Sequence, residues 1–178
     1  IRLAASGSGN VPQFVTQNSS NTLLSATVTL IPNLSSCIGN AVSYTIDVKP
    51  SPQLGALQNK SVCSGDTIPT LNFTSSPLGI QYSWTNSDTT VGLASSGTGA
   101  VPSFVTVNAG NTGISSTISV LPELNSCTGN AVNFTLQVKP IPDFVAPSNQ
   151  TICEGALAAA IPLTSNPPGA SFTWLNNN

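Results

Sequence analysis

Four cysteines are the residues of this sequence best suited to covalent chemistry. They are Cys37, Cys63, Cys127 and Cys153, and they form two equivalent pairs, since 127 − 37 and 153 − 63 both equal 90. The chain is rich in Ser and Thr and contains no Met. Paired thiols in such a chain predict an oxidising compartment and disulfide bonds.

Three pairings of four thiols are possible. The preferred one joins Cys63 to Cys127, because each repeat would then carry its own disulfide, and Cys37 and Cys153 would pair outside the chain or across a contact between chains. The alternative joins Cys37 to Cys63 and Cys127 to Cys153, so that each bond bridges a linker. Reduced, buried thiols also remain open. Zinc is disfavoured, because two thiolates per repeat without His leave a tetrahedral site half empty.

No other set of residues suggests catalysis or cofactor binding. The sequence has no His, which removes the usual general base and the Ser-His-Asp triad. No two carboxylates are spaced for acid–base work, and no hydroxyl or thiol has an evident base beside it. We therefore expect a protein that is not an enzyme and that has no catalytic residues, no cofactor and no metal site.

Charge and hydropathy exclude two further classes of partner. Four basic and six acidic residues give a net charge of −2, and only 6% of the residues are charged. The four cations lie far apart in sequence, so no basic stripe exists for nucleic acid. No apolar run approaches the roughly 18 residues that a membrane span needs.

Two tryptophans could stack on sugars. Trp84, however, alternates with Tyr82 and Ile80 as residues on one face of a strand do, which predicts a core position, and Trp174 is expected to match it. Ser96-Gly97-Thr98-Gly99 resembles a phosphate loop only faintly, because it lacks the Lys and the helix that such loops need. We expect a flexible turn there.

The elements that carry these residues repeat. Residues 1–88 align with residues 91–178 without a gap, and this period suits one β-sandwich domain better than a solenoid coil. Alternating apolar and polar residues predict an all-β fold of tandem immunoglobulin-like sandwich repeats of about 90 residues. Strands of the complete repeat are expected near 54–62, 70–76, 80–86, 91–95, 103–107, 114–121 and 131–139.

Two Pro-x-Pro segments mark where one repeat ends and the next begins. Strand 131–139 ends at Pro140-Ile141-Pro142, as its counterpart ends at Pro50-Ser51-Pro52, and such segments are suitable linkers. The predicted domains are thus 1–50, the C-terminal half of a first repeat; 51–140, a complete repeat; and 141–178, the N-terminal half of a third. Since the first residue is not Met, we expect a processed product or a fragment.

Two half-repeats expose apolar faces and open strand edges. The expectation is either a slice of a longer tandem array or chains joined head to tail, with residues 141–178 of one completing residues 1–50 of the next. A head-to-tail contact of this kind does not close, so it builds a fibre.

Several motifs together resemble one family of repeats. They are Thr151-Ile-Cys-Glu-Gly155, Phe172-Thr-Trp174, Ser126-Cys-Thr-Gly129 and Val138-Lys-Pro-Ile-Pro142, and each has its counterpart 90 residues earlier. The chain thus resembles the PKD-like, immunoglobulin-like repeats of large secreted surface proteins of Bacteroidota. This resemblance implies export, by the type IX route, and a role in adhesins, surface filaments or stalks. It also implies O-glycan acceptors at Thr67 in Asp66-Thr67-Ile68 and at Thr89 in Asp88-Thr89-Thr90.

The expected function is therefore that of an extracellular or cell-surface structural module, whose partners are further copies of the same repeat, in the same chain or in a homopolymer. Surface glycans or proteins are possible further partners. The alternative is a carbohydrate- or protein-binding accessory module of a larger secreted enzyme.

Overall fold

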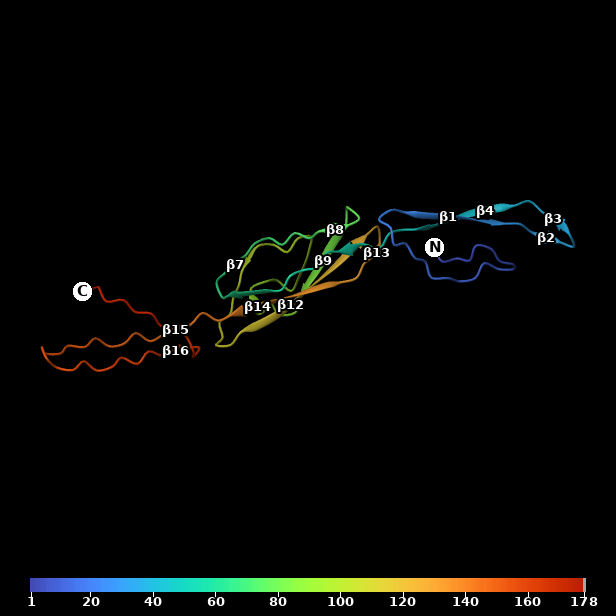
Figure 1. Ribbon diagram of the computed structural model, residues 1–178. Helices are drawn as coiled ribbons and strands as arrows, with labels where there is room; N and C mark the ends of the chain where they lie inside the picture. Colours follow the sequence, from blue (N-terminus) through green and yellow to red (C-terminus); the bar gives the residue numbers. More distant parts are fainter. Residues whose placement is uncertain (178) are drawn as a thin grey trace.

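The computed structural model describes residues 1–177. We refer to residues 1–50 as the head, 51–140 as the central unit and 141–177 as the tail. Head and tail lie at opposite ends of the central unit (Figure 1). The described residues form β-strands and loops, with a single 3-10 turn, η1 (Thr89–Val91). The expectation of an all-β protein is confirmed.

The main sheet of the central unit interleaves strands from its two halves. Its order is β10 (Ser96–Thr98), β9 (Gln81–Asn86), β12 (Ile114–Leu124), β14 (Val132–Lys139) and β6 (Lys60–Cys63), and β13 (Cys127–Thr128) also pairs with β12. Neighbours are antiparallel except β14 and β6, which are parallel. The antiparallel hairpin β12–β14 is thus flanked by β9 on one side and by β6 on the other.

The core lies between this sheet and a second layer. That layer contains β7 (Thr67–Ile68) paired with β11 (Phe104–Val105), and a bridge between Leu71 and Val101. β5 (Gln53–Leu54) and β8 (Ser75–Ser76) form a small separate pair. The hydrophobic core cluster consists of residues of the central unit: Ile68, Trp84, Val91, Leu93, Val101, Ile118, Val120, Phe134, Leu136 and Val138. Alternate residues of β14 supply the last three, as the period of a strand requires.

The head is a hairpin without a second layer. β1 (Leu24–Leu30) pairs with β4 (Val42–Val48), and β2 (Asn33–Leu34) pairs with β3 (Cys37–Ile38) at the far end. The register Leu24–Val48 is that of Ile114–Val138 in the central unit, shifted by 90 residues. The Asn18 amide donates to Val48 O at 2.7 Å, as the Asn108 amide donates to Val138 O at 2.9 Å. The head therefore contains a copy of the hairpin β12–β14.

The tail copies the front half of the central unit less completely. β15 (Asp143–Phe144) pairs with β16 (Ser165–Asn166), in the register of Gln53–Leu54 with Ser75–Ser76. The rings of Phe144 and Phe172 meet edge to face at 5.8 Å. Residues 150–153 and 171–176, which correspond to β6 and β9, belong to no strand. These segments lack the hairpin that holds β6 and β9 in the central unit.

Some predicted strands differ from the observed ones. Those near 80–86, 114–121 and 131–139 are confirmed as β9, β12 and β14. The strand expected at 91–95 is wrong, because Asp88 caps η1 by accepting from Thr90 N, and Gly92 ends it in the left-handed conformation. The turn expected at 96–99 is also wrong over 96–98, which form β10. Within residues 1–177, no helix is long and apolar enough to cross a bilayer.

Candidate interaction surfaces

Both edges of the head hairpin are unpaired. In the central unit, Val120 of β12 lies opposite Trp84 of β9, and Val138 of β14 lies opposite Val62 of β6. The corresponding head strands β1 and β4 pair only with each other among the described residues. Unpaired backbone N–H and C=O groups at such edges are a template for a further strand.

The apolar side chains of the half-repeats are exposed where their counterparts are buried. Val101 and Val120 are 0% exposed, whereas Val11 and Leu30, their equivalents in the head, are 38% and 44% exposed. Tyr44, the equivalent of the buried Phe134, is 40% exposed. In the tail, Ile152, Ile161 and Leu163 are exposed, whereas their equivalents Val62, Leu71 and Phe73 are half-buried. Exposed apolar side chains grouped in this way are typical of interaction surfaces, one on the head and one on the tail.

In the central unit, Trp84 packs against Gly97, and the head and the tail each contain only one residue of the equivalent pair. A Cβ on Gly97 would lie 2.3 Å from Cζ2 of Trp84, so only glycine in β10 leaves room for the indole ring. The indole N–H has no hydrogen-bond partner among the described residues, so packing alone holds the ring. At Gly7, the counterpart of Gly97, a Cβ would meet no atom within 4 Å beyond its chain neighbours.

Trp174 does not occupy the core position expected for it. Trp84 is 3% exposed, but Trp174 is 84% exposed. The physical reason is that β10, β12 and the second layer cover Trp84, and no such elements accompany Trp174 in the tail.

Polar residues that hydrogen-bond to one another in the central unit have equivalents that are divided between the head and the tail. The Thr106 hydroxyl of the central unit donates to Cys63 O at 2.8 Å, and Gly65 N donates to Thr106 O at 2.8 Å. These bonds tie the loop after β6 to the segment after β11. Thr16 is the head equivalent of Thr106 and is exposed, while Cys153 and Gly155 are the tail equivalents of the other two.

The four cysteines are unpaired, and the preferred bond between Cys63 and Cys127 is wrong for this fold. Cys63 lies opposite Lys139 at one end of β14, whereas Cys127 lies beyond Val132 at the other end. The strand between them spans about 23 Å at ~3.3 Å per residue, and a disulfide needs Cα atoms within about 7 Å.

The alternative pairing also fails within one chain. Cys37 lies in β3 at the outer tip of the head, whereas Cys63, the last residue of β6, lies opposite Lys139 at the tail end of the central unit (Figure 1). Cys127 lies at the head end of the central unit and Cys153 lies in the tail.

The two candidate O-glycan acceptors are accessible. Thr67 is an exposed residue of β7, and Thr89 is an exposed residue of η1. Beside Thr89, hydrogen bonds from the Thr90 hydroxyl and then from Thr90 N lower the pKa of the Asp88 carboxyl below its ordinary value. This carboxylate therefore acts as a cap in the fold. The glycan assignment stays a prediction.

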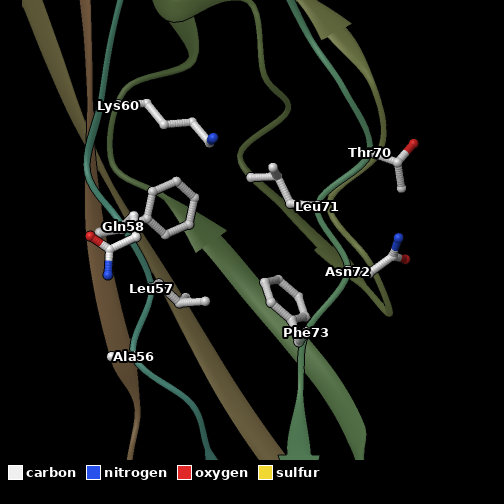
Figure 2. A pocket seen from close by; sticks show the side chains of 9 residues that line it. Ala56, Leu57, Gln58, Lys60, Thr70, Leu71, Asn72 and Phe73 are labelled. Atoms are coloured by element: carbon white, nitrogen blue, oxygen red, sulfur yellow. The ribbon is translucent and has the colours of Figure 1, made fainter.

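A shallow groove of about 410 Å³ lies between residues 56–60 and 70–73 of the central unit. Figure 2 shows Leu57, Leu71 and Phe73 directed into it, with Lys60 at one end. Phe134 completes its apolar floor. The lining offers one amine and no carboxylate or thiol, and no group of three metal-ligating side chains occurs among residues 1–177.

Sequence comparison adds no relative to this description: no protein-family model matches the chain, and neither does any curated protein. The residue that sequence reasoning missed is Gly97 with its counterpart Gly7. The signal available was a glycine repeated in both copies of a pattern that also repeats a tryptophan.

Proposed function

We propose that this chain is an extracellular structural module of tandem immunoglobulin-like β-sandwich repeats, and that its copies assemble end to end into a surface adhesin, stalk or filament. The observation that carries the proposal is the interleaving of strands in the central sheet. There, β6 and β9 from the front half flank the hairpin β12–β14 from the back half. The tail contains the front-half sequence and the head contains the back-half hairpin.

In the proposed contact, the tail of one copy completes the head of the next. Shifting the central registers by 90 residues places tail residues 150–153 parallel to Ile46–Lys49 of β4. It places tail residues 171–176 antiparallel to residues 28–33, on the β1 side of the hairpin. Each new strand pairs an open edge, and the composite sheet has the order of the central one.

The same shift buries the exposed apolar residues. Trp174 of one copy would lie against Gly7 and Leu30 of the next, as Trp84 lies against Gly97 and opposite Val120. Removal of apolar surface from water is the main favourable term in such an association, at about 25 cal/mol per Å².

The proposed contact is heterologous, since head and tail are different surfaces. They lie at opposite ends of the central unit, so one copy can engage a neighbour at each end (Figure 1). The product is a linear array in which completed composite units alternate with central units. Secretion by the type IX route and attachment to a bacterial surface belong to this proposal through the resemblance to PKD-like repeats.

Substitution of Gly7 tests the assembly. A Cβ at Gly7 would have open space within 4 Å, so Gly7→Val leaves the single chain undisturbed. In the composite unit the new side chain would overlap the Trp174 ring of the neighbour. Ser8→Val is the matched control, because the equivalent Thr98 is exposed in the folded central unit. Light scattering after size exclusion and negative-stain microscopy measure the assemblies.

The expected result is fibres for the unmodified chain and for Ser8→Val, and monomers for Gly7→Val. An unmodified chain that remains a monomer at every concentration would refute end-to-end assembly. The groove of Figure 2 favours the second candidate function, a carbohydrate- or protein-binding accessory module. Monomers that bind glycans, with binding lost on Phe73→Ala, would favour it over the structural module.

A further inference from the structure

We infer that successive copies are linked by two disulfide bonds, one between Cys63 of one copy and Cys37 of the next, and one between Cys153 of the first and Cys127 of the next. The inference rests on the proposed end-to-end assembly. It starts from the position of the cysteine loops, because Cys63 and Cys127 lie at opposite ends of the central sheet and face opposite neighbours.

The loop that contains Cys127 holds the linker from the head. A Cβ on Gly129 would lie 2.1 Å from Pro52 O, so the linker backbone packs directly on this loop. The Lys49 ammonium group donates to Asn125 O at 3.0 Å, two residues before Cys127. The loop 125–129 therefore contacts Lys49, just before the three-residue linker Pro50-Ser51-Pro52, and Pro52, its last residue.

The loop that contains Cys63 holds the linker to the tail. Ser64 N donates to Lys139 O at 2.8 Å. A Cβ on Gly65 would lie 3.7 Å from Cδ1 of Ile141, the middle residue of the second linker. Each linker therefore has a place for two cysteine loops, one from the repeat that precedes it and one from the repeat that follows it.

The 90-residue shift brings the two kinds of loop to one linker. Cys153 and Gly155 of a neighbouring tail would take the places of Cys63 and Gly65, so Cys153 would lie opposite Lys49 and Gly155 near Ser51, the equivalent of Ile141. Ser51 is followed directly by Pro52, which contacts the Cys127 loop. The two cysteines thus flank the same linker, one from each copy.

The same argument applies at the next linker. Cys63 already lies beside Ile141, and Pro142 is the equivalent of Pro52. The loop that would receive Pro142 is Ser35–Gly39 of the next head, which contains Cys37.

Both half-repeat loops are already formed in the single chain. Gly39 N donates to Pro32 O at 2.9 Å, as Gly129 N donates to Pro122 O at 2.9 Å. Ala156 N donates to Cys153 O at 3.1 Å, as Asp66 N donates to Cys63 O at 3.2 Å.

The two equivalent glycines differ in what covers them. Atoms of the linker residue Pro52 fill the space over Gly129, whereas the atoms nearest to a Cβ on Gly39 all belong to Pro32 of the same hairpin. This difference is what an unfilled place for the Pro142 of another copy requires.

The bonds form by thiol–disulfide exchange with a small oxidised disulfide such as oxidised glutathione. One cysteine thiolate attacks it, forms a mixed disulfide and releases one glutathione thiolate. The thiolate of the neighbouring copy then attacks the protein sulfur of the mixed disulfide and releases the second. Two electrons pass from the cysteines to glutathione, and the two cysteine protons end on the released thiols. Cys37, Cys63 and Cys153 are exposed and Cys127 is half-buried, so the reagent can reach them.

Four double variants test this pairing with two cysteines left in each. The chain is assembled under reducing conditions, treated with oxidised glutathione and separated on non-reducing denaturing gels. Each interface carries two bonds, so the variants that remove one whole pair, C37S/C63S and C127S/C153S, should still give a ladder of linked chains. The variants C63S/C127S and C37S/C153S remove one partner from each pair, and they should run as single chains.

A different gel pattern overturns the inference. A ladder from C63S/C127S together with none from C37S/C63S would mean that Cys153 pairs with Cys37 of the neighbouring copy and not with Cys127. Fibres under reducing conditions that give no ladder after oxidation would refute the disulfides and leave the proposed assembly standing. Absence of fibres, measured by light scattering before oxidation, would refute the assembly itself.

Discussion

Replacing Trp174 with alanine should abolish assembly without changing the stability of the central unit. The side chain is 84% exposed in the single chain, whereas Trp84 in the completed unit is 3% exposed. The expected burial on assembly is therefore most of the surface of one tryptophan, about 200 Å².

The magnitude follows from that area. At ~25 cal/mol per Å², burial of the ring contributes about 5 kcal/mol to each contact between copies. Truncation of a buried tryptophan to alanine costs about 3–5 kcal/mol in folded cores. Since each 1.4 kcal/mol is a factor of ten, the dissociation constant of the contact should rise by roughly 100- to 4,000-fold.

Sedimentation velocity over a range of concentrations measures this constant for the unmodified chain and for Trp174→Ala. Trp84→Ala is the matched comparison, because the same truncation then acts inside the central unit. It should lower the free energy of unfolding by about 3–5 kcal/mol in urea titrations. Trp174→Ala should leave the unfolding transition of the monomer unchanged, because nothing covers the ring there.

Association of Trp174→Ala within tenfold of the unmodified chain would refute the reasoning. The ring would then remain outside the interface, and the 90-residue shift would not describe the contact. An equal loss of monomer stability in both variants would also contradict it, since Trp174 would then be part of a core within its own chain.

Three further changes have defined outcomes. Gly97→Ala should destabilise the central unit by about 1–3 kcal/mol in urea titrations, because the new methyl group overlaps the indole ring. The pKa of Asp88, measured by carboxyl NMR titration, should lie below the ordinary value, and Thr90→Val should raise it. Because the folded pKa is the lower one, this cap should stabilise the fold above the unfolded pKa and lose its effect as pH falls through the folded pKa. Intact mass of native material should show hexose additions that disappear in the double variant Thr67→Val, Thr89→Val.

The alternation of apolar and polar residues predicted the long strands of the central sheet. Val132 to Val138 alternate strictly with polar residues, and the structure has β14 there with its apolar side chains in the core. Residues 91–95 also alternate, but the capping side chain of Asp88 and the glycine at position 92 stabilise a 3-10 turn instead. A local hydrogen bond of this type competes with strand pairing and leaves no trace in hydropathy.

The cysteine pairing shows the limit of a repeat interpreted without topology. Two thiols in each period favoured one disulfide in each repeat, although a plain immunoglobulin topology places the two cysteine loops at opposite ends of the sandwich and favours a bridge between neighbouring repeats. The parallel pairing of β6 with β14 decides this, because it places Cys63 beside Lys139. Gly97 was missed for a related reason: its role depends on the ring of Trp84 across a strand pair, 13 residues away in sequence (97 − 84).

The parallel pair β6–β14 has a mechanical consequence. The polypeptide chain enters the central unit at the head end, before β6, and leaves it at the tail end, after β14. Tension along an array therefore pulls these two neighbouring strands in opposite directions along their own axes. All hydrogen bonds between the strands are then loaded in shear at once, and they cannot open one by one as in a peeled hairpin. In the proposed composite unit, residues 150–153 and β4 meet in the same geometry, so the joint between two copies would resist tension in the same way as the interior of one.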